Sequence, residues 1–183
     1  MAYVTPGTVA AGDVATAAAW NVITNDVIAM RASAINVVTT LVTAPVTVSL
    51  GTTGTSAVVT GLTVNITPTS SSSKILILAS MNLYEPTSGT FVFLRRNSSA
   101  IMVGDANGSR QRVTTQAGGA SVGTISMLFL DSPATTSSVT YDVAAMSGGT
   151  PSRTYYVNRD DTYTNATNYF TSASSITVME IPV

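Results

Sequence analysis

Hydrophobic and polar positions follow two different periods along the chain. Near the N-terminus, apolar residues recur at alternating spacings of three and four, which places them on one side of an α-helix. The positions are Trp20, Ile23, Val27, Met30, Ala34, Val37 and Leu41. Such a seam, sustained over three heptads, is typical of helices that associate with copies of themselves. We therefore expect these residues to form a seam through which copies of the chain associate.

The limits of this helix follow from local signals. Thr16 is a suitable N-cap, because its hydroxyl can accept a hydrogen bond from a free N–H group of the first turn. Residues 36–40 are poor helix formers, and Pro45 prevents continuation. We expect the helix to end between Ser33 and Leu41.

From Pro45 onward, short runs of Val, Ile, Thr, Phe and Tyr alternate with clusters of Gly, Pro, Ser and Asn, which predicts strands divided by turns. The predicted strands are Val46–Leu50, Ser56–Thr60, Leu62–Thr67, Lys74–Tyr84, Gly89–Arg96, Ala100–Val103, Arg110–Gln116, Gly123–Leu130, Ser138–Met146, Thr154–Val157 and Ser175–Ile181. No helical pattern interrupts them, so parallel βαβ units are excluded. The pattern favours a mainly β fold, an antiparallel β-sandwich or jelly roll preceded by an N-terminal α-helix. Residues 1–44 then form an anchoring and trimerisation segment, and residues 45–183 form the head domain.

Composition agrees with a folded β domain and narrows its partners. Thr and Ser contribute 30 and 22 of the 183 residues, the hydrophobic fraction is 45%, and the net charge is −1. β-branched Thr suits a pleated surface, and this hydrophobic fraction argues against disorder. Sparse, balanced charge predicts no nucleic-acid binding, and no apolar stretch is long enough to predict membrane insertion.

The chain contains neither Cys nor His. This excludes Ser-His-Asp and Cys-His nucleophile systems, imidazole acid–base catalysis and disulfides, and it leaves zinc without its usual ligands. The DANGS sequence at 105–109 is similar to the start of a calcium loop, but no Glu follows at the position that would complete it. A hairpin turn is the simpler interpretation. Asp160 and Asp161 are adjacent and would point apart on an extended chain, so we expect no metal at this position or elsewhere. We also expect no cofactor.

Glu180 lies within the apolar run Ile176–Ile181, where a buried charge needs a partner. Arg95 and Arg96, in a comparably apolar run, could supply one, so we predict a structural ion pair. Glycoside hydrolysis needs two carboxylates facing each other across a sugar, and no such pair is evident among the two Glu and seven Asp. We expect that the protein is not an enzyme.

Aromatic residues gather near the C-terminus, where the segment from Thr154 to Phe170 holds five of the eleven Tyr and Phe. Rings beside Asn, Arg and Asp can stack on and hydrogen-bond a sugar or a protein surface. The candidate receptor-binding residues are Tyr155, Tyr156, Arg159, Asp160, Asp161, Tyr163, Asn168 and Tyr169. The alternative interpretation is that these rings pack in the core and at the edges of the last strands.

Residues 7–31, GTVAAGDVATAAAWNVITNDVIAMR, resemble the leader of structural proteins of tailed bacteriophages. The β region is similar to the C-terminal domain of phage fibre and minor structural proteins, in TPTSSSSKILILAS, FLRRNSSAIMVGDANGSR, FLDSPATTSSVTYDV, YYVNRDD and the ending SSITVMEIPV. The resemblance implies a virion component, commonly a homotrimer with a head like the jelly rolls of the tumour-necrosis-factor and complement-component type.

The function expected from this resemblance is a short trimeric tail or head fibre, or spike, that contributes to host attachment and contacts other virion proteins through its N-terminal segment. A host surface glycan or protein would be its receptor. The alternative is a capsid decoration protein that stabilises the head, and a third, weaker alternative is a carbohydrate-active enzyme. The chain has almost no shaft between helix and head, unlike long fibres, so a short capsid spike is also a possible interpretation.

Overall fold

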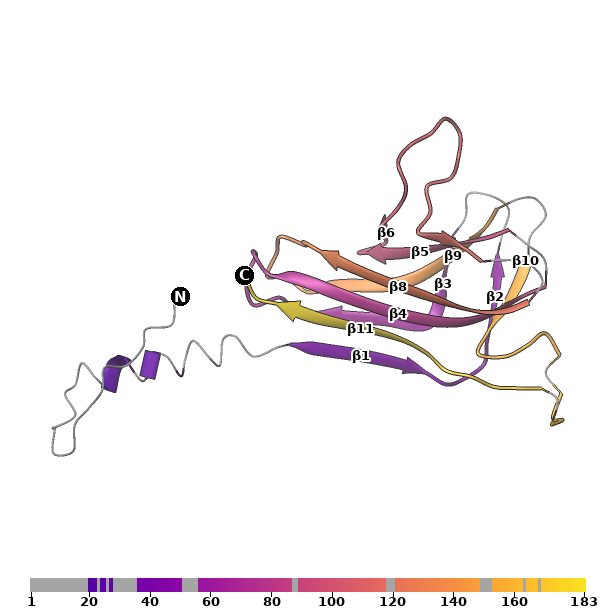
Figure 1. Ribbon diagram of the computed structural model, residues 1–183, viewed down its shortest axis with the longest axis horizontal. Coiled ribbons are helices and arrows are strands. Elements are labelled where there is room, and N and C mark those ends of the chain that lie inside the picture. Colours follow the sequence, from indigo (N-terminus) through magenta and orange to yellow (C-terminus); the bar gives the residue numbers. More distant parts are fainter. Residues whose placement is uncertain are drawn as a thin grey trace.

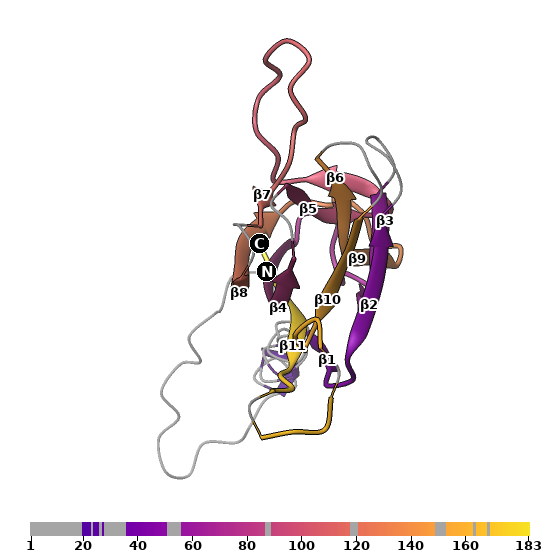
Figure 2. The ribbon, with the colours of Figure 1, turned by 90° about the vertical axis from the view of Figure 1, so that its right-hand side faces the viewer.

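The computed structural model describes residues 20–22, 24–25, 27, 36–50, 56–86, 89–117, 121–148, 153–162, 164–167 and 169–183. Within them, antiparallel strands form two sheets that face each other, as Figures 1 and 2 show. The predicted mainly β, antiparallel sandwich is therefore confirmed.

The first sheet contains β1 (Val37–Val42), β11 (Ser174–Ile181), β4 (Lys74–Glu85), β10 (Arg153–Val157) and β2 (Val46–Leu50) in this order, and β8 (Ser121–Asp131) also pairs with β4. The second sheet contains β3 (Ser56–Ile66), β9 (Val139–Ser147), β5 (Thr90–Arg96) and β6 (Ser99–Ile101), and β7 (Thr115–Gln116) also pairs with β5. The long strand β4 is central, because β11 and β10 share one of its edges and β8 occupies the other.

The core lies between the sheets and follows the alternation of the strands. On β4, Ile75, Ile77, Ala79, Met81 and Leu83 are buried, while the residues between them face outward. Side chains of β9, β5 and β3 meet them from the second sheet, and the buried residues form one continuous cluster. This alternation is what a sheet with one covered face requires.

The predicted strands agree with the observed ones except at three places. The predicted strands on either side of Gly61 are one strand, β3, with a register shift between Val58 and Thr63. Gly61 has a φ of +86°, and an added Cβ would lie 3.0 Å from a methyl group of Val42, so glycine permits both the bend and the close approach. The predicted strand at 110–116 shrinks to β7, because residues 102–114 form the long loop that projects between β6 and β7 in Figure 2.

The third difference corrects the predicted helix. Trp20 and Val27 are helical, but Val37–Val42 form strand β1, which pairs along its whole length with β11. Val37 and Leu41 are therefore strand residues and not members of a helical seam. Trp20 and Val27 are exposed. Ile23, Met30 and Ala34 lie outside the described residues.

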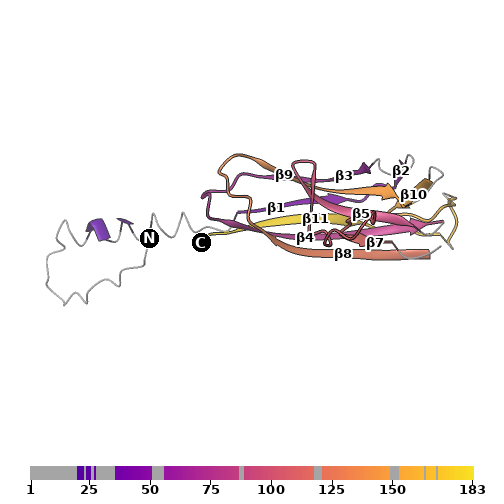
Figure 3. The same ribbon diagram turned by 90° about the horizontal axis from the view of Figure 1, so that it is seen from above.

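The two ends of the sandwich differ. β1 begins and β11 ends at one end, where the C-terminus also lies, whereas the loop between β10 and β11 lies at the opposite end (Figures 1 and 3). The segment that precedes β1 therefore joins the sandwich at the end remote from the loop between β10 and β11.

Among the described residues, no helix is long and apolar enough to cross a membrane.

Candidate functional site

The candidate site is the loop between β10 and β11, and Asn158 fixes its base. Asn158 is fully buried and adopts a φ of +65°, a left-handed conformation that Asn tolerates better than most residues. Its Nδ2 donates hydrogen bonds to the carbonyl oxygens of Val42 (2.7 Å) and Ala44 (3.2 Å), and its Oδ1 accepts one from the Ser174 hydroxyl (2.6 Å). One side chain thus ties the end of β10 to the end of β1 and the start of β11.

Backbone contacts then close the loop. The N–H of Ser172 donates to the carbonyl of Asn158 at 3.0 Å, and Arg159 and Thr171 form an isolated antiparallel bridge. Residues 160–170 extend beyond this closure and contain short-range turns, among them the bond from the Tyr169 N–H to the Ala166 carbonyl. A fixed base carrying a largely exposed tip is a common arrangement for binding loops.

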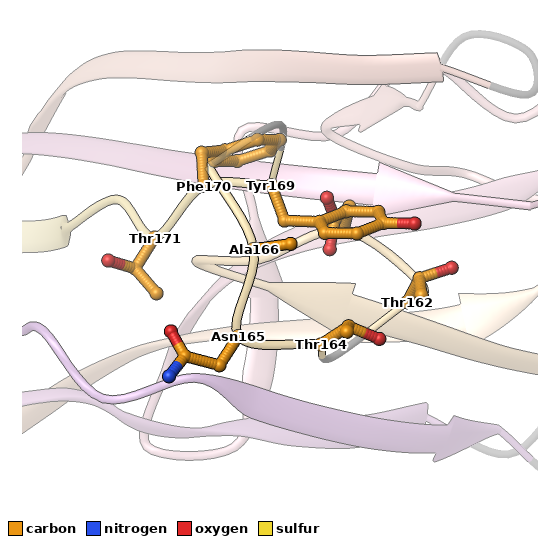
Figure 4. A pocket seen from close by; sticks show the side chains of 8 residues that line it. Thr162, Thr164, Asn165, Ala166, Tyr169, Phe170 and Thr171 are labelled. Carbon is orange, nitrogen blue, oxygen red and sulfur yellow. The ribbon is translucent and has the colours of Figure 1, made fainter.

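The tip surrounds a cavity of about 420 Å³. Its lining residues are Asp160, Thr162, Thr164, Asn165, Ala166, Tyr169, Phe170 and Thr171. Figure 4 shows the ring of Tyr169 extending toward Thr162, while Asn165 and Thr171 lie on the other side of the chain. The cavity therefore combines two aromatic rings with hydroxyl, amide and carboxylate groups.

Arg159 links this loop to strands β10 and β2. Its guanidinium lies 4.1 Å from the ring centre of Tyr156, donates to the carbonyl of Asp160 at 3.0 Å, and donates to the hydroxyl of Thr47 at 3.0 Å. A cation over an aromatic face is attractive, and the two hydrogen bonds fix the guanidinium plane. Arg159 therefore shapes the backbone next to the cavity.

Asp161 contacts a second ring on the neighbouring strand. The hydroxyl of Tyr84 donates to Oδ2 of Asp161 at 3.4 Å, and the rings of Tyr84 and Tyr156 are 6.3 Å apart. Desolvation and the nearby Asp161 carboxylate both raise the pKa of Tyr84, so the phenol stays protonated and remains a donor. This cluster offers hydrogen-bonding groups and aromatic rings beside the cavity.

The structure brings together only part of the predicted receptor-binding set. Asp160 and Tyr169 line the cavity, Arg159 and Tyr156 support it, and Asp161 is exposed beside it. Tyr163 and Asn168 lie outside the described residues.

Tyr155 was wrongly placed among the contact residues. It is fully buried and faces the core, because strand alternation directs neighbouring Tyr155 and Tyr156 to opposite faces of the sheet. For Tyr155, the alternative interpretation as a core residue holds. The sequence prediction also omitted Phe170 and the small polar lining residues, for which the only signal was their position within the same aromatic segment.

The predicted ion pair of Glu180 with Arg95 or Arg96 is wrong. Glu180 is buried, but its Oε1 accepts hydrogen bonds from the N–H (2.7 Å) and the hydroxyl (2.6 Å) of Thr69. Arg95 and Arg96 are instead paired with two other carboxylates, those of Asp142 and Asp131. The carboxylate therefore ties the loop after β3 to β11.

Both arginines have acidic partners, in the same sheet for Arg95 and across the sandwich, at the end of β8, for Arg96. Nε of Arg95 lies 2.6 Å from Oδ1 of Asp142, which is its register neighbour on β9. Arg96 donates to both carboxylate oxygens of Asp131, at 3.0 and 2.9 Å, and the buried hydroxyl of Tyr141 donates to the same carboxylate at 2.7 Å. These groups link neighbouring strands and the two sheets of the sandwich.

We expect Glu180→Gln to lower the stability of the protein at pH 7. Burial alone would raise the pKa of Glu180, but the hydrogen bonds from Thr69 outweigh it and hold the pKa below its ordinary value of 4.5. The ionised carboxylate therefore stabilises the fold above about pH 4.5, and this contribution is lost as pH falls through the lower folded-state pKa. The expected loss at pH 7 is about 1–2 kcal/mol, shrinking toward pH 3, in urea unfolding followed by circular dichroism.

Glu85→Gln is the matched control, because it shows the opposite sign. Burial raises the pKa of Glu85 despite the hydrogen bonds from Thr90, so the stabilising protonated form is fully present below about pH 4.5 and is lost as pH rises through the folded-state pKa. This variant should match the wild type at low pH and gain relative to it as pH rises. Parallel pH profiles for the two variants would contradict both assignments.

The DANGS segment lies in the exposed loop that projects between β6 and β7, where Nε of Arg112 donates to the carbonyl of Gly104 at 2.6 Å. Over the described ranges, no three acidic side chains are grouped so that they could hold a metal ion. The loop is stabilised by its own hydrogen bonds and by the left-handed Gly108.

No protein-family model and no curated protein sequence matches this chain. Among solved structures, the chain is similar to one chain in the structure of infectious bursal disease virus Gx strain, with 9% sequence identity and a TM-score of 0.40. The alignment covers 81% of this chain and 38% of the viral chain, so this chain spans well under half of that neighbour. At this identity and TM-score, the likeness does not place the chain in a family.

Proposed function

We propose that the protein is a structural component of a tailed-bacteriophage virion, a short trimeric fibre or spike that contributes to host attachment. The observation that carries this proposal is the position of the cavity in the loop between β10 and β11, at the end of the sandwich opposite to the start of β1 (Figures 1 and 3). A segment before β1 that anchors the chain would leave this loop facing away from the particle. The sequence resemblance to phage structural proteins supports the same role.

The chemistry of the cavity suits a polar surface ligand such as a host glycan. Tyr169 and Phe170 offer rings on which a sugar can stack, and Asp160 and Asn165 offer groups that hydrogen-bond hydroxyls. A single exposed cavity of this kind would bind weakly. Three copies on a trimer and several trimers on a particle would raise the effective concentration enough to hold a cell.

The role we propose is passive and not enzymatic. Asp160 is the acidic residue that lines the cavity among the described residues, and Asp161 follows it directly in the sequence. Cleavage of a glycosidic bond requires two carboxyl groups about 5–9 Å apart that flank the bond. The loop therefore provides contacts without the opposed acid and base that hydrolysis needs.

We expect Tyr169→Ala to slow adsorption of particles to host cells by about tenfold or more, because loss of a central aromatic contact is multiplied over many copies. The half-buried ring lies in a loop tip, so the melting temperature should change little. Adsorption rate and thermal melting are measured on the same variant, with Asn107→Ala in the exposed projecting loop as the control. Unchanged adsorption, or a large fall in melting temperature, would contradict a contact role for Tyr169.

Particles that lack the protein distinguish the proposed attachment role from capsid decoration. If the protein is an attachment protein, its removal leaves particle stability unchanged and abolishes adsorption. A decoration protein leaves adsorption unchanged and makes heads release their DNA at lower temperature. An image of the intact particle would then place the protein on the tail or on the head.

A further inference from the structure

The outer face of the first sheet carries large apolar side chains that nothing in the described part of the chain covers. We use the term "outer face" for the outward-pointing residues of β1, β11, β4 and β8. They are Val37, Thr39 and Leu41 on β1, Ser175, Thr177, Met179 and Ile181 on β11, Lys74, Leu76, Leu78, Ser80, Asn82 and Tyr84 on β4, and Val122, Thr124, Ser126, Leu128 and Leu130 on β8. Their neighbours along each strand point into the core.

The register places these residues in rows that cross the four strands. One row is apolar throughout, because Val37 pairs with Met179, Met179 with Leu76, and Leu76 with Leu130. The next row contains Thr39, Thr177, Leu78 and Leu128 in the same order. Residues facing each other across strands are close enough to form one continuous surface.

Exposure and charge set this surface apart from an ordinary solvated sheet. The exposed fractions of Leu128, Leu78 and Leu41 are 63%, 42% and 64%. The only charged residue on the outer face is Lys74, at its margin. The solvated face of an antiparallel sheet normally carries polar and charged residues. Large aliphatic side chains in adjacent rows therefore mark an interaction surface.

Strand β8 adds an open edge to the same surface. Among the described strands it is hydrogen-bonded to β4 alone, along eleven residues. Proteins commonly protect a long edge strand with charges, prolines or bulges. From Ser121 to Leu130, β8 contains none of these charged or proline residues, and its register with β4 is continuous.

We infer that the outer face packs against a second copy of this chain. A Leu, Met, Val and Thr surface is complementary to another surface of the same composition, and the charges near it, Lys74 on one side and Asp161 beside Tyr84 on the other, lie at its margins. With strands about 4.8 Å apart and residues about 3.3 Å apart, the outer face covers roughly 500 Å² per copy. Three copies that direct this face inward would bury roughly 1,500 Å² in total, which is the area of a standard interface.

This inference rests on the proposed trimeric assembly and gives it a location. The predicted helical seam cannot include Val37 and Leu41, which lie in β1, but both residues lie on the outer face. Three copies around a common axis can each direct this face inward. The loop between β10 and β11 would then lie at one end of the assembly, and the start of β1 at the other.

The test is Leu128→Lys in the full chain. Its side chain points to solvent and contributes little to the core, so the isolated fold should keep its circular dichroism spectrum. Three charges brought together in an assembled trimer would oppose one another and lose hydration. Val58→Lys is the control, since Val58 is 40% exposed on β3 in the second sheet. Molar mass is measured by light scattering coupled to size-exclusion chromatography at about 10 μM.

We expect the wild type and Val58→Lys to be trimers and Leu128→Lys to be a monomer, with one third of their molar mass. A Leu128→Lys variant that remains trimeric would overturn the assignment of the surface and leave the proposed trimer standing. A monomeric wild type would overturn both, and would point to a segment of the same chain or another virion protein as the occupant. A wild-type dimer that Leu128→Lys dissociates would support the surface and contradict the trimer.

Discussion

Replacing Tyr155 with Ala is expected to lower the free energy of unfolding by about 3–5 kcal/mol, the range measured for large aromatic residues deleted from packed cores. Tyr155 lies on β10, opposite Val48 of β2, and is fully buried within the cluster between the sheets. Removing the ring leaves a cavity bounded by two sheets whose hydrogen-bonded strands cannot close it. Much of the protein would then be unfolded at 37 °C if its stability is ordinary.

Tyr155→Phe distinguishes the contribution of the ring to stability from that of the hydroxyl. Within the described residues the hydroxyl is buried without a hydrogen-bond partner, and burial raises its pKa far above the ordinary value, so it stays protonated. Removing an unsatisfied polar group costs nothing and can gain about 1 kcal/mol. Equilibrium unfolding in urea should therefore rank Phe at or above the wild type and Ala far below it. An Ala variant with wild-type stability and reduced adsorption would restore Tyr155 as a contact residue.

The period of the apolar residues explains which elements could be predicted. Most strands from β2 onward show alternation or short β-branched runs between turn signals, and these patterns together favour strands over helices. Val37 and Leu41 are four apart, a spacing that puts two residues on one face of a helix and also on one face of a strand. The unfavourable helix propensities of residues 36–40 were the better guide, because β-branched side chains fit a pleated sheet. Distance along the chain could not show that β11 supplies the partner strand.

The partners of buried polar groups were beyond prediction for a related reason. Glu180 was recognised as a buried charge, yet its partner Thr69 is 111 residues away in a serine-rich loop that carries no charge to suggest it. Arg95 and Asp142 become neighbours only through the register of β5 with β9. A sequence can show that such a group needs a partner, but sheet order decides which one it meets.

Asn158 shows the same limit within the candidate site, and it leads to the second large effect. In the sequence it stands at the head of a polar, aromatic segment and has the composition of an exposed loop residue. In the structure it is buried, and its amide links three segments of the first sheet. The stability of the whole loop therefore depends on a residue that lies outside the lining of the cavity.

Asn158→Asp is expected to destabilise the protein by about 3–5 kcal/mol at pH 7. The substitution replaces the Nδ2 donor with an oxygen that faces the carbonyls of Val42 and Ala44, so two hydrogen bonds become repulsive contacts, and it buries a charge with no cation assigned to it. Protonation would relieve part of this cost, so the gap to the wild type should narrow as pH falls. Urea unfolding at several pH values measures both effects.

Asn107→Asp is the control for Asn158→Asp, because it makes the same chemical change in the exposed projecting loop. It should leave stability within about 0.5 kcal/mol of the wild type. Equal stabilities for the two Asp variants would show that the amide of Asn158 does not hold the loop. If Asn158→Asp unfolds the loop before the sandwich, hydrogen exchange will rise first in residues 159–172 and leave β4 protected. That order would separate the loop that carries the cavity from the sheets that support it.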